Sequence, residues 1–251
     1  MKNGHGAESL AGGPRWTVEG LPAQPAVAGE ARPLASRDRQ SGYAVEDSEH
    51  GDHMSETHSY PIGIPGQPWG HPERAAWRDR QRIQRSYAEE VLARIAPLHA
   101  TLDVQQYGTL STPDGDYPLL MLRSRGWDPA RPTALITGGV HGYETSGVQG
   151  AIRFAATEAT RLSTQLNLAI FPCISPWGYE TINRWNPDAV DPNRSFVPDS
   201  PSAECALMMA AVARLGEITV HIDLHETTDT DNSEFRPARA ARDAIDRKSV
   251  V

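Results

Sequence analysis

The sequence has no apolar run near the roughly 18 residues that a membrane-spanning helix needs. It also lacks an excess of positive charge. The formal net charge is −8 and the isoelectric point is about 5.6, which argues against a surface for nucleic acids. The N-terminus carries no apolar core of a signal peptide. We therefore expect a cytoplasmic protein whose partners include neither nucleic acid nor a membrane.

Cysteine is scarce as well. The two cysteines, Cys173 and Cys205, lie in apolar or helical contexts, and neither belongs to a C-x-x-C pair. This pattern predicts two buried free thiols and excludes a disulfide-stapled fold.

Apolar residues are also sparse and without period in the first part of the chain. Residues 1–58 are dominated by Gly, Pro, Ser, Glu, Asp and Arg, so they cannot bury enough surface to offset the entropy of ordering. We predict a disordered segment over residues 1–58 and one folded domain over residues 59–251.

The folded part alternates between strand-like and helix-like patterns. The predicted helices are 72–95, 146–156 and 201–215, and the predicted strands are 101–110, 117–123, 134–136, 166–172 and 217–224. The first two strands flank a Pro-Asp-Gly turn and should form a hairpin. Strand, helix, strand is typical of a parallel sheet covered by helices. We therefore predict an α/β fold with a mostly parallel mixed sheet between helices, and a long, functional loop over 175–201.

A first group of metal-ligand side chains follows the strand 134–136. His141 and Glu144 lie three residues apart, where the strand gives way to a helix. An imidazole and a carboxylate are two of the three protein ligands that a catalytic zinc needs. This short motif is also compatible with a solvated histidine and a glutamate at the start of a helix.

A second group lies at the end of the strand 217–224. Alternation places His221, Asp223 and His225 on one face, with His225 at the carboxyl end of the strand. Ligands bind at this edge of open α/β sheets, so His225 can meet His141 although 84 positions separate them. Asp223 is a candidate acceptor that orients a ligand histidine.

A third group lies on the loop 175–201, where Arg184 and Arg194 are ten residues apart among several Asn and Asp side chains. Arginine suits planar, bidentate recognition of carboxylates. Two arginines beside a candidate metal indicate an anionic substrate or a developing oxyanion.

Together the three blocks carry a resemblance. His-Gly-Tyr-Glu, then Pro-Trp-Gly-Tyr-Glu with Asp-Pro-Asn-Arg-Ser-Phe, then Asp-Leu-His resemble the zinc carboxypeptidase superfamily in order and spacing, over roughly residues 140–228. The resemblance implies a catalytic domain that removes a C-terminal amino acid from a peptide by means of Zn²⁺ and an activated water. It also implies that the substrate ends in a free carboxylate.

The resemblance also suggests roles for individual residues. His141, Glu144 and His225 correspond to the zinc ligands. Arg184 resembles the arginine that polarises the scissile carbonyl, and Asn193 and Arg194 resemble the pair that grips the terminal carboxylate of the substrate.

One expected part has no counterpart in the sequence. The family needs a glutamate general base on a later strand, but only 26 residues follow His225. Their carboxylates include Glu226, Asp229, Asp231 and Glu234, none of which follows an apolar strand. We therefore expect a C-terminally truncated member with impaired hydrolysis, because a general base typically contributes about 10²–10⁴-fold to the rate.

Two alternatives remain open at this stage. A deacylase of the aspartoacylase and succinylglutamate desuccinylase type shares Gly-Gly-Val-His-Gly-x-Glu and Asp-Leu-His, and it would cut an N-acyl amino acid. The other alternative is a catalytically inactive zinc-binding fragment.

Overall fold

The computed structural model describes residues 62–64 and 66–226, so the prediction of disorder over 1–58 lies outside the described residues. The helical elements are α1 (His71–Arg78), η1 (Ala88–Leu92), α2 (Ala93–Ile95), η2 (Ala96–Ala100), α3 (Thr145–Thr157), α4 (Ala159–Leu162), α5 (Pro176–Thr181), η3 (Pro192–Arg194) and α6 (Ala203–Val212). The strands are β1 (Leu102–Thr112), β2 (Gly115–Ser124), β3 (Thr133–Gly138), β4 (Asn167–Phe171) and β5 (Val220–Leu224). Within these described ranges, no helix is both long enough and apolar enough to cross a membrane.

The strands form one mixed sheet in the order β1-β2-β4-β3-β5. The predicted hairpin is present as the antiparallel pair β1–β2, and β2 is antiparallel to β4. Strand β3 pairs in parallel with β4 on one side and with β5 on the other. The predicted α/β fold with a mixed sheet is therefore confirmed. The three parallel strands β3, β4 and β5 all end at the same edge of the sheet, which is the edge that collects the candidate site residues.

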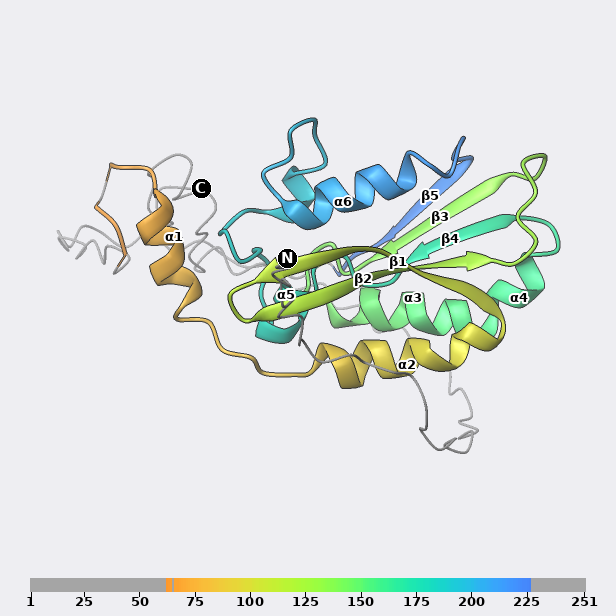
Figure 1. The fold of residues 1–251 in the computed structure, drawn as a ribbon, viewed down its shortest axis with the longest axis horizontal. Helices are drawn as coiled ribbons and strands as arrows, with labels where there is room; N and C mark the ends of the chain where they lie inside the picture. Colours follow the sequence, from red (N-terminus) through yellow and green to blue (C-terminus); the bar gives the residue numbers. More distant parts are fainter. Residues whose placement is uncertain (1–61, 65, 227–251) are drawn as a thin grey trace, which may run out of the picture. The chain divides into compact units, whose positions relative to one another are not determined.

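Helices cover both faces of the sheet, with α2 and α3 on one face and α6 on the other (Figure 1). The alternation of side chains in β3 and β4 explains this arrangement. Ile136 and Ile170 belong to the core that includes α3, whereas Leu135 and Phe171 pack in the core that includes Met208 of α6. Because β3 and β4 are buried on both faces, they read as continuous apolar runs.

The single helix predicted over 72–95 is wrong in its middle. Helix α1 ends at Arg78, and helical structure resumes only at η1. Between them, the backbone N–H groups of Gln84 and Arg85 donate to the carbonyl of Glu180, at 2.8 and 3.3 Å. The N–H of Tyr87 donates to the Glu180 carboxylate at 2.7 Å. These contacts with α5 replace intrahelical bonds, so tertiary structure overrides a helical sequence pattern that holds no glycine or proline at this point.

The long loop predicted over 175–201 contains the short helices α5 and η3 and connects β4 to α6. Cys173 and Cys205 are buried free thiols, as predicted. The Cys205 thiol donates to the carbonyl of Pro192 at 3.3 Å and so ties α6 to the end of this loop.

Candidate metal centre

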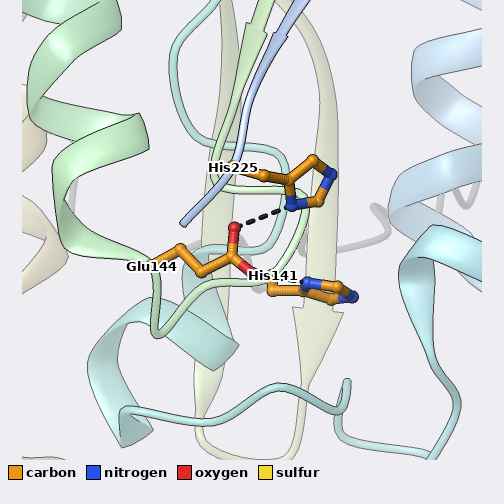
Figure 2. Close-up of side chains that lie close together, drawn as sticks. All are labelled: His141, Glu144 and His225. Atoms are coloured by element: carbon orange, nitrogen blue, oxygen red, sulfur yellow. Dashed lines mark hydrogen bonds and ion pairs between the residues drawn. The ribbon is translucent and has the colours of Figure 1, made fainter. Parts of the chain in front are cut away.

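His141, Glu144 and His225 meet at the carboxyl edge of the sheet, with one potential ligand atom of each residue within 4.8 Å of the others. Figure 2 shows the Glu144 carboxylate between the two imidazole rings. Glu144 Oε1 lies 2.7 Å from His141 Nδ1, and Glu144 Oε2 lies 2.7 Å from His225 Nδ1. The structure therefore brings together the three residues that the sequence analysis identified as metal ligands.

The backbone before His141 depends on glycine. Gly139 has φ of 62°, a left-handed conformation that turns the chain away from β3. Gly142, between the two ligands, lies so close to α5 that a Cβ would overlap the backbone of Gly178 and Tyr179. Glu144 then occupies the N-cap position of α3. These features present His141 and Glu144 on one side of a tight, buried turn.

The second nitrogen of each imidazole faces an aspartate. His141 Nε2 lies 3.0 Å from Asp191 Oδ1, and His225 Nε2 lies 2.8 Å from Asp223 Oδ2. An N–H donated from Nε2 to an aspartate leaves Nδ1 with a lone pair, which is the form that binds a metal. In both rings, Nδ1 points toward the Glu144 carboxylate at 2.7 Å, a contact that a shared proton or a metal ion would make favourable.

Each of the two imidazoles lies between two carboxylates. A neutral imidazole has one N–H, yet each ring faces carboxylate oxygens at both nitrogens. Burial opposes a charged His141 ring, but the hydrogen bonds to Asp191 and Glu144 outweigh it and raise the pKa of His141. Burial likewise opposes ionisation of Glu144, but hydrogen bonds from His141 and from the backbone N–H of Glu226 lower its pKa. The donor set of two imidazoles and an ionised carboxylate fits a divalent metal.

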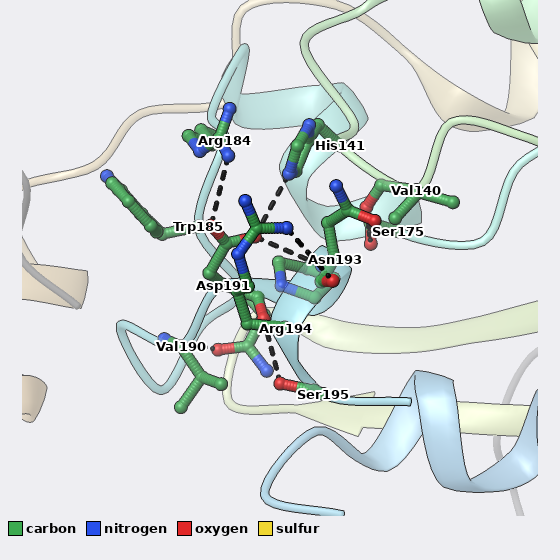
Figure 3. A network of polar contacts seen from close by, with 12 residues as sticks. Val140, His141, Ser175, Arg184, Trp185, Val190, Asp191, Asn193, Arg194 and Ser195 are labelled. Carbon is green, nitrogen blue, oxygen red and sulfur yellow. Dashed lines mark hydrogen bonds and ion pairs between the residues drawn. The ribbon is translucent and has the colours of Figure 1, made fainter. Parts of the chain in front are cut away.

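The two aspartates are anchored differently. Asp191 accepts the backbone N–H of Asn193 at 3.0 Å and a guanidinium N–H of Arg184 at 3.0 Å (Figure 3). Burial raises the pKa of Asp191, but its bonds to His141 and Arg184 bring it below the ordinary value. Asp223 accepts the Thr137 hydroxyl at 2.6 Å. Sequence reasoning gave no role to Asp191 or Thr137, although Asp191 lies within the Asp-Pro-Asn-Arg block.

The loop residues singled out from the sequence surround this centre. Arg184 shares the Asp191 carboxylate with His141, and its side chain is 29% exposed. Arg194 is exposed, and its Nη1 lies 3.4 Å from the carbonyl of Asn193. Figure 3 shows both arginines on the side of His141 that bears Asp191.

A cavity of about 510 Å³ adjoins the centre on the α6 side of the sheet. Its walls are mostly apolar and include Val140, Phe196 and Met208, while Asn193 and Asp223 are among its few polar residues. Val140 and Asp223, which line the cavity, are next to His141 in the chain and hydrogen-bonded to His225, respectively.

Glu226 is the one general-base candidate that falls within the described residues. Its carboxylate accepts the backbone N–H of Ser146 at the start of α3, at 2.5 Å, and its own N–H donates to Glu144. The side chain is therefore engaged in capping α3. Asp229, Asp231 and Glu234 lie outside the described residues.

Comparison with known proteins yields matches among solved structures. A metallo-carboxypeptidase from Burkholderia cenocepacia matches at 21% identity and a TM-score of 0.46, covering 55% of this chain and 40% of that one. A metallo-carboxypeptidase from Pseudomonas aeruginosa, in complex with (2-guanidinoethylmercapto)succinic acid, matches at 22% identity and a TM-score of 0.46, covering 55% and 39%. No family profile and no curated protein sequence matches this chain.

Structures from three Shewanella species also match, and the chain spans 52%, 61% and 49% of their lengths. This chain is therefore similar to metallopeptidases over part of their length.

Proposed function

We propose that His141, Glu144 and His225 bind Zn²⁺ and that the chain is the catalytic part of a metallocarboxypeptidase-type hydrolase. Such an enzyme removes the C-terminal amino acid of a peptide. When bound, zinc supplies a Lewis acid that polarises an amide carbonyl and acidifies water.

The observation that carries the proposal is the geometry of the three ligands. One carboxylate faces two Nδ1 atoms at 2.7 Å each, and both Nε2 atoms face aspartates. Three protein ligands of this kind, with carboxylates behind the histidines, are typical of a catalytic zinc that keeps an open position. Zinc binding would satisfy both lone pairs and the carboxylate at once.

The surrounding residues support a substrate with a free carboxylate. Arg194 is exposed and its guanidinium can bind a carboxylate in a bidentate way, and the neighbouring Asn193 lines the cavity. Arg184, held against Asp191, can donate to an oxyanion that develops near the metal. The adjoining apolar cavity offers room for an uncharged group of the substrate.

Zinc content measured by elemental analysis is the first test, on the full chain and on His141→Ala and His225→Ala. We expect about one zinc per chain in the wild type and loss of zinc in both variants. A folded wild type without zinc, supplied with the metal, would contradict the assignment of the ligands.

The reaction is tested separately, with a blocked dipeptide that ends in a free carboxylate and with an N-acyl amino acid. Release of the C-terminal amino acid from the dipeptide supports a carboxypeptidase. Cleavage of the N-acyl amino acid alone would replace that reaction by a deacylase. Stoichiometric zinc with turnover of neither would leave a zinc-binding protein without this activity.

A further inference from the structure

Arg85 lies in the segment where the predicted helix over 72–95 is interrupted, and it contacts the turn that carries His141 and Glu144. Its Nη2 donates to the carbonyl of Gly142 at 2.9 Å, and its Nη1 donates to the hydroxyl of Thr145 at 2.5 Å. Its Nε donates to the carbonyl of Tyr179 at 2.5 Å, and the guanidinium lies 3.6 Å from the centroid of the Tyr179 ring. Each of the three nitrogens of this half-buried guanidinium thus donates to one protein acceptor.

Two of these acceptors flank the ligand Glu144. Gly142 lies between His141 and Glu144, and Thr145 directly follows Glu144 at the start of α3. The third acceptor is on α5, the helix whose backbone touches Gly142. Arg85 therefore connects the turn that carries two ligands to the helix that supports it, and it touches neither ligand side chain.

We propose that Arg85 is a positioning residue of the metal centre, which holds the turn from His141 to Thr145 in the conformation that binds the metal. This inference rests on the proposed zinc site. The planar guanidinium fixes the spacing of its acceptors, because its donors are arranged as a rigid fork. A lysine has the same charge but cannot span the three acceptors in one plane. The shape of the guanidinium is what the turn requires.

Arg85→Lys tests this role through metal affinity, measured by competition with a chelator, and through the absorption spectrum of the Co²⁺-substituted protein. We expect the zinc dissociation constant to rise about tenfold or more, in the range typical of residues that orient metal ligands. We also expect the cobalt bands to shift, because they report ligand geometry. A residue that only stabilises the fold would lower the unfolding midpoint of the metal-free protein and leave both readouts unchanged.

Arg94→Lys is the matched control. Arg94 lies in α2, and its Nη1 donates to the Gln149 side chain of α3 at 2.7 Å. It does not touch the turn, so its zinc affinity and cobalt spectrum should equal those of the wild type.

Thr145→Val serves as a second variant in case Arg85→Lys does not fold, since it removes one acceptor of Arg85 and keeps the side-chain shape. We expect weaker zinc binding, restored by Thr145→Ser. Wild-type affinity and spectrum in folded Arg85→Lys, or in Thr145→Val, would overturn the role of Arg85 and leave the zinc site intact. A wild type that binds no zinc would instead overturn the proposed function, and this role with it.

Discussion

The two halves of the candidate metal centre have the same chemistry in different surroundings. Each half is a histidine with Nδ1 toward Glu144 and Nε2 on an aspartate. The His141 side chain is 3% exposed, whereas the His225 side chain is 28% exposed. Their strands differ in the same way: Ile136 of β3 is 3% exposed, and its register partner Ile222 of β5 is 49% exposed.

The difference in exposure indicates which histidine is fixed more firmly by the residues around it. The His141 half is anchored by Asp191, which also binds Arg184 and the N-terminal end of η3. The His225 half has Asp223, supported by the hydroxyl of Thr137 at a water-accessible edge. A hydrogen bond away from water constrains a side chain more strongly, because no water competes for the donor or acceptor. We therefore expect the His141 half to contribute more of the preorganisation.

Asp191→Asn should give the largest effect of the changes that leave all three ligands in place. It removes the charge that faces His141 Nε2 and leaves the Arg184 guanidinium without its carboxylate. We expect zinc affinity to fall about 10–100-fold, the typical loss for such partners of ligand histidines. Chelator competition measures this value. Asp188→Asn, an exposed position in the same loop, is the control and should bind zinc like the wild type.

Asp223→Asn should have a smaller effect on zinc affinity. Both His225 and Asp223 are about 30% exposed, so water can replace part of the lost interaction. We expect a loss of less than about tenfold, which is below the usual range of about 10–100-fold. Thr137→Val should lose still less, since it removes only the hydroxyl that Asp223 accepts. If Asp223→Asn lost as much zinc affinity as Asp191→Asn, the two halves would contribute equally, contrary to this expectation.

The sequence predicted the part of this centre that depends on strand ends. Apolar runs identify β3 and β4, and alternation identifies β5. The carboxyl ends of parallel strands meet at one edge, so His141 and His225 could be paired across 84 positions. The sequence also made Asp223 a candidate acceptor for a ligand histidine, and in the structure Asp223 Oδ2 lies 2.8 Å from His225 Nε2. These inferences depend on local periodicity and a general rule of sheet topology.

Local sequence patterns could not predict contacts between residues that are far apart in the chain. The interruption of the helix over 72–95 arises from the bonds of Gln84 and Arg85 to Glu180, and nothing in the local sequence breaks the helix there. Ile83, which lies in this interrupted stretch, is 59% exposed. The role of Arg85 follows from that interruption, so it too required the three-dimensional structure.

The smallest expected effect is on stability and concerns Glu204, which contacts Asn186 in the loop that carries Asp191. It is completely buried in α6, and its Oε2 accepts the Asn186 amide at 3.5 Å while its Oε1 has no hydrogen-bond partner. Burial raises the pKa of Glu204 above its ordinary value, against hydrogen bonds from its own backbone N–H, Ser202 and Asn186. The folded state therefore favours the protonated acid.

The pKa of this carboxyl group is higher in the folded protein than in the unfolded chain. As the pH rises above the unfolded pKa, the unfolded chain loses its proton first, and the folded state becomes less stable relative to it. We expect the Glu204 contribution to lower wild-type stability as the pH rises above about 4.5, the ordinary pKa of a glutamate. Glu204→Gln keeps the acceptor for Asn186 and removes the ionisation. It should raise the free energy of unfolding at pH 8 by roughly 1 kcal/mol, or about 2–4 °C in the midpoint, with little change at pH 4. Thermal unfolding of the metal-free protein measures this difference, with the exposed Glu217→Gln as control. An equal change in the unfolding midpoint at both pH values would mean that Glu204 is not held as the neutral acid. A charged carboxylate would then accept the Asn186 amide in the loop that carries Asp191.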